Sequence, residues 1–589
     1  MPRIWLAKPK HKPRNHTSFD NMKLSRSHFK QELKACKKDV DREILLSIED
    51  RFKDSNKKQF WQEVNKRRGG RVVMNSIDGY DTPIDILKIF STNFLPDSAV
   101  LNENDIICNS IVREGWMQNP QFNTCVSSHT VIKLIGKLNA GCGHDGIHSN
   151  ILKHATYNFI ENCTYFLNLC FMHCFLPPDI LKGDISPIIK DKKGNKSDSS
   201  NYRPVMQSSC LLKVFELHLL SILEDKVKLD FRQFGFVNGA STTDACLLLK
   251  ETVNRYINDK YPVYANFIDL SKAFDLVDHS ILLTELVNRK IPADIISILC
   301  FYFRHQEARV KIDAHCGDYR RISQGVRQGG IISPFLFKLY IDGVIRQLSS
   351  LDVGCRFGMS RINVVAYADD IVLLASSHSA LELIYKEFKN SMRHLKLKIN
   401  VIKSKVVLFY KGRQRINFNN ITIDNDDFEV VSEFTYLGNI ITYNLGDSGD
   451  VKLKLNNFYS SFHSVFRNFN GINLESFLHL FNSICVPQYG LPLWNSPNIF
   501  NNQIFKAFEV AYSNALKKIL GCPKFSSSHI VAAICQQLLF QHGVNLCQAR
   551  YLHKVLKHLY QIFAFHGIHF KSGIFFQPRY IILLTLNLM

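Results

Sequence analysis

Tyr367-Ala368-Asp369-Asp370 carries the strongest structural signal in this 589-residue chain. Two adjacent carboxylates lie between two apolar, β-branched runs, which predict strands at 363–368 and 371–375 with the acids at the turn of a hairpin. An unpartnered pair of carboxylates is costly to desolvate, so we expect a positive charge beside it. A divalent metal with oxygen ligands fits that requirement best. Taken alone, the motif is also compatible with a solvated turn, because Asp is common in turns.

A third acid, Asp269, comes one hundred residues before Asp369, at the end of an apolar run. Residues 263–269 predict a strand that delivers this acid at its end, and the residues from 271 onward predict a turn into a helix. Such an acid can complete a metal site together with Asp369. Two metal ions held by carboxylates are a known device for phosphoryl transfer.

A glycine-rich loop lies between these acids in the sequence. Residues 323–330 form this loop, which carries Arg327, Gln328 and Gly329. Apolar residues at helical spacing follow from 335 to 348 and predict a helix. The glycines allow a backbone to approach a ligand closely, and the start of a helix favours negative charge.

These three segments, in this order, resemble the A, B and C motifs of a reverse transcriptase palm. More specifically, the chain resembles the polymerases of non-LTR (LINE-type) retrotransposons. The resemblance covers residues 130–445 and continues more weakly to about 560. Any one of these motifs is weak evidence by itself. Because all of them occur in the same order as in the family, a match by chance is very improbable. Further matches run in the same order as in that family, at Gly143–Ile147, Pro187–Lys190, Asn201–Val205, Gln233–Phe236, Ser241–Asp244, Lys398–Asn400, Lys403–Lys405 and Tyr436–Gly438.

The resemblance implies an α+β fold, the right-hand polymerase, with fingers, a palm built on an antiparallel sheet, and a helical thumb. A strand at 405–410 is expected to join the palm. We expect the following regions: a basic helical N-terminal extension at 1–115, fingers at 120–260, palm at 261–445, a helical thumb and C-terminal region at 446–565, and at 566–589 a tail that resembles nothing we can place.

The resemblance also implies a reaction, RNA-directed DNA synthesis, in which a primer 3′-hydroxyl attacks the α-phosphate of a dNTP. Asp269 and Asp369 are expected to hold two Mg²⁺ ions, for which Mn²⁺ can substitute. Asp370 is expected to complete the acidic cluster. The expected partners are an RNA template, a DNA primer and the dNTPs, with the RNA of the element itself as the template.

Other site residues follow from the same resemblance. Lys190 and Arg203 match the positions that grip the triphosphate, although both are also compatible with ordinary solvated charge. Gln328 and Gly329 match the loop beside the nucleotide sugar. Lys403 is a candidate for protonating the leaving group, and Lys405 competes with it for that role.

Phe274, five residues after Asp269, matches an aromatic residue that packs under the sugar. A 2′-hydroxyl would clash with such a ring, so the site is expected to prefer deoxynucleotides. A core phenylalanine is the alternative interpretation.

Composition agrees with a polyanionic partner. The chain has 73 Lys and Arg against 52 Asp and Glu, a net charge of +21. Residues 1–71 hold 20 of these cations and 9 of the acids, so about half of the net charge lies in the first eighth of the chain. Phe60-Trp61 in this region is an expected apolar anchor. Neutralisation of phosphates by this segment would make nucleic-acid binding salt-dependent.

Several competing patterns carry less weight. Gly141–Gly146 spells the dinucleotide fingerprint G-x-G-x-x-G, but residues 130–138 before it have helical rather than strand spacing. The family usually has proline where this chain has His144. Cys170 and Cys174 lie on an apolar helical stretch without a second ligand pair at zinc spacing, so they are expected to be core thiols. No secretory signal or membrane span is expected, which favours the cytoplasm and the nucleus.

Three functional hypotheses remain at this point. The first is an active polymerase, which the intact acids Asp269, Asp369 and Asp370 favour. The second is an inactive retrotransposon remnant that only binds nucleic acid. The third is a protein like the group II intron maturases, for which we see no splicing or DNA-binding module after the thumb. Because only about 115 residues precede the expected fingers, too few for an endonuclease domain, the chain is expected to be a truncated reading frame or a fragment.

Overall fold

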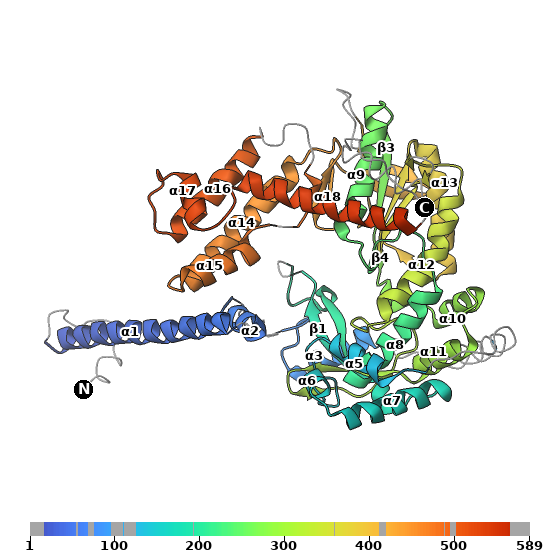
Figure 1. Cartoon of the computed structure of the whole chain (residues 1–589), viewed down its shortest axis with the longest axis horizontal. Coiled ribbons are helices and arrows are strands. Elements are labelled where there is room, and N and C mark those ends of the chain that lie inside the picture. The colour runs from blue at the N-terminus through green and yellow to red at the C-terminus, as the bar shows by residue number, and fades with distance from the viewer. Residues whose placement is uncertain are drawn as a thin grey trace. The chain divides into compact units, whose positions relative to one another are not determined.

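Two groups of residues make up the computed structural model, whose chain Figure 1 traces. Unit 1 combines residues 1–72 with residues 448–551, and unit 2 contains residues 73–447 and 552–589. Among the described residues, one hydrophobic cluster lies in unit 1 and two lie in unit 2. The expected extension, residues 1–115, is thus divided between the units. The expected tail at 566–589 lies outside the described residues. The structure describes residues 17–54, 57–68, 76–95, 110, 125–191, 194–357, 360–410, 420–487, 489–494 and 502–565.

A six-stranded sheet lies at the centre of unit 2. Its strands follow the order β10-β11-β3-β13-β15-β14, and all neighbours are antiparallel except β13 and β15. The four predicted strands of this sheet are confirmed to within one residue at each end. The bounds are β3 Val263–Ile268, β10 Val364–Tyr367, β11 Asp370–Ala375, β13 Lys405–Phe409, β14 Ile421–Ile423 and β15 Asp426–Val430.

Helices cover this sheet because its central strands are apolar on both sides. All residues of β11 after Asp370 are buried, as are the first three residues of β10. The helix α9 (Thr242–Asn258) packs on β10 and β3, α12 (Ser333–Ser350) packs on β10, and α13 (His378–His394) packs on β11. A capping box starts α9, in which Ser241 and Asp244 bond each other's backbone N–H groups. The helix predicted at 335–348 is confirmed as α12.

A second sheet in unit 2 has the strand order β2-β1-β5-β6, with β7 beside β5. Its strands β1 and β2 form an antiparallel hairpin, and β1 runs parallel to β5. The strand bounds are β1 Lys182–Ile189, β2 Tyr202–Ser208, β5 Glu307–Ile312, β6 His315–Cys316 and β7 Arg320–Arg321. The helices of this part are α3 Pro83–Phe94, α5 Ser128–Gly136, α6 Ser149–Lys153, α7 Tyr157–Met172, α8 Cys210–Lys226, α10 His279–Asn288 and α11 Ala293–His305. Unit 2 therefore has the expected α+β composition.

Unit 1 is helical and has an aromatic core. The predicted anchor Phe60 is 1% exposed, and its ring contacts are with Phe52, Trp61 and His479. These partners lie in unit 1 rather than in the expected fingers. The helices are α1 Thr17–Lys53, α2 Lys57–Arg68, α14 Ser448–Phe469, α15 Leu474–Leu480, α16 Gln503–Ile519, α17 Ser528–Ile534 and α18 Phe540–Phe565, the last of which begins in unit 1.

The structure also resolves the competing patterns. The helix α5, not a strand, precedes the Gly141–Gly146 sequence, so the dinucleotide interpretation is excluded. Cys170 is buried in α7, and Cys174 is half-buried just after it. Burial raises the pKa of each of these thiols to about 11, as expected of core cysteines. Among the described helices, none combines the length and apolar character that a membrane crossing requires.

Candidate active site

A two-residue turn, Ala368-Asp369, closes the β10–β11 hairpin as the sequence predicts. Tyr367 pairs with Asp370 at the last register position, so Asp369 and Asp370 both lie at the turn end of the hairpin. Ala368 has a φ of +56°. This left-handed conformation costs a residue with a side chain about 1–2 kcal/mol, so neighbouring contacts must hold it.

Asp269 reaches the same end of the sheet from the neighbouring strand. β11 pairs with β3 so that Ile371 lies opposite Ile268, which brings Asp269 beside Asp370. Desolvation raises the pKa of Asp269 and of Asp369. Desolvation, with the charges of Asp369 and Asp269 added, raises the pKa of Asp370 to about 6. The three predicted acids are therefore close enough to repel one another.

The donor atoms of this acidic cluster are carboxylate oxygens, the type of ligand that hard divalent cations prefer. The part of the chain that the structure describes contains no group of three or more His, Cys, Asp or Glu side chains arranged as a ready-made metal centre. Asp269, Asp369 and Asp370 themselves offer carboxylate oxygens at the ends of neighbouring strands. Magnesium is commonly bound in this way, because it keeps several waters and takes one or two carboxylates plus substrate phosphates.

The segment 398–404 fixes the backbone of Asp269. The Asp269 N–H donates to Ser404 Oγ at 3.0 Å, and the Asn400 N–H donates to the Asp269 carbonyl at 2.8 Å. Ser404 is fully buried, and its hydroxyl donates to the Asn400 carbonyl at 2.7 Å. The strand β12 (Lys398–Ile399) pairs with β4 (Leu270–Ser271) next to these bonds. Residues 398–404, although far from Asp269 in sequence, therefore hold the backbone of this acid in place.

Three basic side chains from different elements lie within electrostatic range of one another or of the acids. Lys190 follows β1, Arg203 lies on β2, and Lys403 lies in the segment after β12. Desolvation lowers the pKa of Lys190, and Arg203 and Lys403 lower it further. Desolvation dominates the pKa shifts of Asp369 and Asp269, while the charges of Arg203 and Lys403 respectively act in the opposite direction. Cations that repel one another beside a carboxylate cluster are well placed to receive a polyanion.

Lys403 and Lys405 differ in their surroundings. Lys405 Nζ lies 2.6 Å from Glu429 Oε2 and donates to the Ile402 carbonyl at 2.8 Å. Lys403 is exposed and acts electrostatically on Asp269. Of the two competing candidates, Lys403 is therefore the one whose charge acts on the acidic cluster.

The glycine-rich loop presents Gln328 and Gly329 beside the hairpin of β1 and β2. Gln328 Nε2 donates to Asp275 Oδ1 at 2.7 Å, and its carbonyl accepts the Met206 N–H at 2.7 Å. Gly329 has a φ of +106°, and a Cβ there would lie 2.8 Å from the Met206 carbonyl oxygen. Only glycine fits this position without a shift of the backbone.

Arg327, in the same loop, is buried in the fold, unlike Gln328 and Gly329. It is 4% exposed, and its Nε donates to Gln306 Oε1 at 2.9 Å. Its guanidinium also lies 4.9 Å from the centre of the Tyr302 ring. The loop thus buries its arginine and leaves Gln328 near the candidate site, a division that the sequence alone did not indicate.

Phe274 packs on the core without being fully buried. Its ring stacks on Phe337 of α12 with 4.7 Å between centroids and 14° between planes. The side chain nevertheless remains partly exposed. Its carbonyl accepts the Val326 N–H at 2.8 Å, which ties the turn after Asp269 to the glycine-rich loop.

Asp275 is a site residue that the sequence did not single out. Desolvation raises the pKa of this carboxyl, while the hydrogen bond from Gln328 acts in the opposite direction. Lys190 and Lys272 lie within electrostatic range of it. The only signal in the sequence was an acid directly after Phe274, which does not differ from a solvated acid in a turn.

Known proteins are similar in sequence to the region that contains this site. A family model described as reverse transcriptase (RNA-dependent DNA polymerase) matches residues 190–441. The retrovirus-related Pol polyprotein from the type-1 retrotransposable element R2 of Nasonia vitripennis is 28% identical over 227 residues, which are 38% of this chain and 22% of that protein. The probable RNA-directed DNA polymerase from transposon X-element of Drosophila melanogaster is 23% identical over 452 residues, 74% of this chain and 48% of that protein.

A third relative, the probable RNA-directed DNA polymerase from transposon BS of Drosophila melanogaster, is 28% identical over 249 residues, 41% of this chain and 26% of that protein. The chain spans less than half the length of each of these relatives. A solved structure of apo telomerase from Candida Tropicalis, truncated from its C-terminal domain, aligns with 49% of this chain and 59% of that chain at 13% identity, with a TM-score of 0.32.

The matched region, residues 190–441, contains the three acids, the basic side chains beside them and the glycine-rich loop. The strand register brings Asp269 beside Asp370, and the family match spans both residues. Residues 190–441 are therefore similar to reverse transcriptase domains, and the relatives named above come from transposable elements.

Proposed function

We propose that this protein is an RNA-directed DNA polymerase that extends a DNA primer with dNTPs on an RNA template. One observation carries the proposal. Asp269, Asp369 and Asp370 meet at one end of the central sheet, Arg203 acts electrostatically on Asp369, and Lys190 lies within electrostatic range of Arg203. Acids that can hold metal and cations that can hold a triphosphate are the two components that nucleotidyl transfer needs.

Asp269 and Asp369 would hold two Mg²⁺ ions, or Mn²⁺ in their place, and Asp370 would complete the cluster. When bound, the ions would lower the pKa of the primer hydroxyl and neutralise charge on the leaving pyrophosphate. The protein's own contribution is to position the reactants and to neutralise charge. The Asp269 N–H donates to Ser404 and the Asp269 carbonyl accepts from Asn400, so these bonds would keep that ligand in place.

The basic side chains would bind the triphosphate of the incoming nucleotide. Arg203 suits this role because a guanidinium binds phosphate oxygens through two parallel hydrogen bonds. Lys190 adds a second cation, and Lys403 would donate the proton that the pyrophosphate takes up. Gln328 and Gly329 would lie beside the nucleotide, with Gln328 held by its bond to Asp275.

The exposed part of Phe274 would pack under the sugar and exclude a 2′-hydroxyl. The rest of the ring stacks on Phe337, so the residue would be held rigidly in that position. This rigidity is what a steric filter requires, because a mobile ring would yield to the larger nucleotide.

The larger assignments rest on the same proposal. The fingers would comprise residues 120–260, the palm 261–445 and the thumb 446–565. The template would be the RNA of the element itself, and the protein would act in the cytoplasm and the nucleus. The intact acids favour an active polymerase over an inactive remnant that only binds nucleic acid.

Primer extension with the purified protein tests the proposal. A DNA primer annealed to an RNA template should be lengthened with dNTPs in the presence of Mg²⁺, and chelation of the metal should stop the reaction. A protein that binds the primer–template but never extends it, with either Mg²⁺ or Mn²⁺, would instead be a nucleic-acid-binding remnant.

A further inference from the structure

A buried side chain holds the turn that carries Asp369. Gln233 is 2% exposed, and its Oε1 accepts the Ala368 N–H at 2.9 Å and the Gly235 N–H at 3.0 Å. Ala368 is the left-handed residue of the turn. The bond from Gln233 therefore acts at the position where the turn is least favourable by itself.

The backbone around Gln233 also lies against the hairpin. The Phe234 N–H donates to the Ala366 carbonyl at 2.8 Å, and the Ala366 N–H donates to the Arg232 carbonyl at 2.9 Å. A Cβ on Gly235 would lie only 2.4 Å from the Ala368 nitrogen. Residues 232–235 thus pack closely against β10 and its turn.

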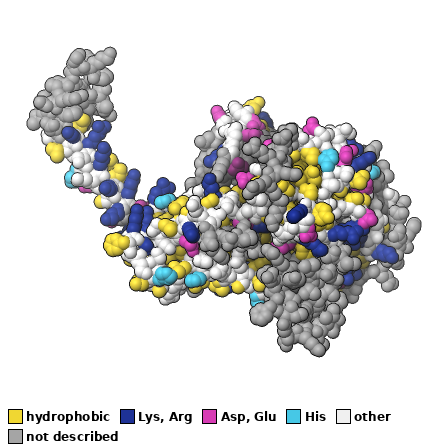
Figure 2. All heavy atoms as spheres, turned by 90° about the horizontal axis from the view of Figure 1, so that it is seen from above, with side chains coloured by type: hydrophobic (Ala, Val, Ile, Leu, Met, Phe, Trp, Pro, Cys, Tyr) yellow, Lys and Arg dark blue, Asp and Glu magenta, His cyan; other side chains and the backbone are white. Residues whose placement is uncertain are grey.

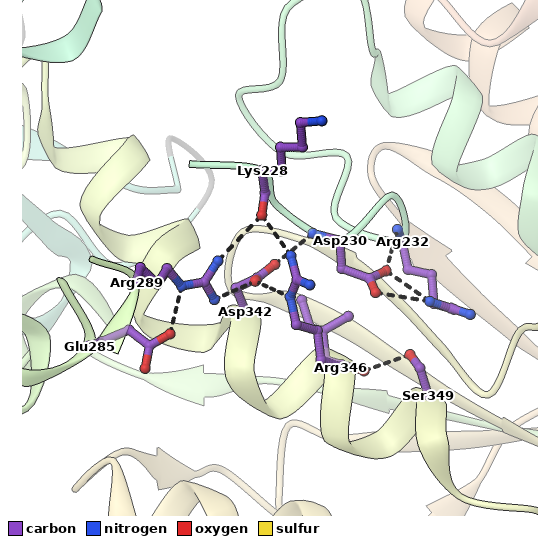
Figure 3. Close-up of polar contacts among 9 residues, drawn as sticks. Lys228, Asp230, Arg232, Glu285, Arg289, Asp342, Arg346 and Ser349 are labelled. Carbon is purple, nitrogen blue, oxygen red and sulfur yellow. Dashed lines mark hydrogen bonds and ion pairs between the residues drawn. The ribbon is translucent and has the colours of Figure 1, made fainter. Parts of the chain in front are cut away.

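This segment is anchored in turn to α12, as Figure 3 shows. Asp342 is fully buried, and its Oδ1 accepts the Asp230 N–H at 2.7 Å. Its Oδ2 lies 2.6 Å from both Arg289 Nη2 and Arg346 Nε. Asp230 also binds Arg232 Nη1 at 2.9 Å. Such buried charge networks are costly to break, so residues 230–235 have a rigid support.

We infer that Gln233 is a positioning residue for the acidic cluster: it fixes the Ala368-Asp369 turn so that Asp369 lies beside Asp269. The metal-binding part of this inference rests on the proposed function, whereas the fixing of the turn does not. Without the Gln233 acceptor, the Ala368 N–H loses its partner and the left-handed turn loses its support. Asp369 would then occupy a range of positions, and its affinity for a divalent metal would fall.

Gln233→Met tests this inference, because methionine keeps the length of the side chain and removes the acceptor. Gly235→Ala is an independent second variant, which disturbs the turn by crowding the Ala368 nitrogen. Asn363→Leu is the matched control for the first variant, since Asn363 is a fully buried amide that bonds the Leu348 carbonyl at the other end of β10. Gly343→Ala is the control for the second, since a Cβ at Gly343 in α12 meets nothing within 4 Å.

The first measurement needs no metal. Hydrogen–deuterium exchange of the Ala368 amide should become about tenfold faster in Gln233→Met and in Gly235→Ala, while the amides of β11 keep their protection. The control variants should leave the Ala368 amide unchanged. Unchanged exchange in both test variants, or an equal increase in Asn363→Leu, would overturn the fixing of the turn. If Gln233→Met does not fold, Gly235→Ala decides.

The second measurement is Mn²⁺ binding to the protein alone, followed by the electron paramagnetic resonance of free Mn²⁺. The parent should show binding that Asp369→Asn removes, and both test variants should bind about tenfold more weakly or worse. Absence of any binding that depends on Asp369 would count against the proposed function itself. Binding that depends on Asp369 but is unaffected in both test variants would overturn only the positioning role of Gln233.

Discussion

Basic side chains are arranged in opposite ways in the two units. In unit 2, Lys190, Arg203 and Lys403 come from three separate elements, and the charges of Arg203 and Lys403 both act on Lys190. Arg203 also acts on Asp369, and Lys403 acts on Asp269. In unit 1, the cations of α1 are spread along a helix whose residues 21–44 are all exposed, as the dark blue side chains in Figure 2 illustrate. Convergent cations indicate a site for one particular anion, whereas dispersed cations indicate attraction to any polyanion.

The two units also differ in how their sequences relate to their folds. The matched region, residues 190–441, lies entirely in unit 2, where the strand register brings Asp269 beside the turn of the β10–β11 hairpin. Unit 1 holds its parts together through an aromatic core that includes Phe60 and Phe458. Changes in unit 2 should therefore act on chemistry, and changes in α1 should act on binding alone.

The largest effect is expected from Asp369→Asn. The change keeps the size of the side chain and removes a charged ligand, so turnover should fall by about 10³-fold or more while primer–template affinity survives. Primer extension beside a binding titration measures both. Asp427→Asn, at an exposed acid on β15 of the same sheet, is the matched control and should retain activity. Equal activity of Asp369→Asn and the parent would refute the assignment of the metal site.

Sugar selection should change next most strongly. Phe274→Val opens space where a 2′-hydroxyl would lie, so incorporation of ribonucleotides relative to deoxynucleotides should rise on the order of 10²-fold. The ratio is measured by single-nucleotide extension with each substrate. Because Phe274 also stacks on Phe337, a thermal melt must show that the variant is folded. An unchanged ratio in a folded, active variant would mean that the ring serves only the core.

A smaller effect should separate Lys403 from Lys405. Lys403→Ala should lower turnover by up to about 10²-fold if this side chain donates a proton to the leaving group. Lys405→Ala should change turnover little, because that ammonium is paired with Glu429 on a partly exposed surface. Single-turnover rates at saturating dNTP measure both variants. A larger loss in Lys405→Ala than in Lys403→Ala would reverse the assignment.

Much of the catalytic unit could be predicted because its signals are local. The β-branched runs around Asp369 give the strands, and a two-residue turn fixes the register of the hairpin. The acid Asp269 at a strand end could be placed for the same reason. The resemblance to a known family then predicts that these segments form one site. No local sequence pattern could predict that.

What could not be predicted depends on contacts between distant residues. Arg327 and Gln328 are adjacent polar residues in one loop, yet only the first is buried, against Gln306. The bond from Gln233 to Ala368 spans 135 positions. The packing of Phe60 with His479 likewise could not be predicted from the residues around either one. Such pairings become visible only when the tertiary structure is known.

The smallest effect is expected from the exposed cations of α1, and the structure changes how it should be tested. Deletion of residues 1–71 would remove Phe60 and Val64, which are buried in the core of unit 1. Removal of a buried phenylalanine side chain alone costs about 3–5 kcal/mol, so a deletion would confuse the effect of charge with the effect of structure. Substitution of exposed lysines avoids this problem. Suitable positions are Lys23, Lys30, Lys34 and Lys37.

Changing these four lysines to glutamine should weaken RNA binding and flatten its dependence on salt. For each phosphate that the protein no longer neutralises, the slope of log affinity against log salt concentration should fall by roughly 0.7–0.9. Turnover on a saturating short primer–template should persist, because Lys190 and Arg203 are untouched. The same four changes to arginine keep the charge and should keep the slope. An unchanged slope together with a loss of turnover would mean that α1 supports the fold of the polymerase, and the contrast between convergent and dispersed cations would then fail for unit 1.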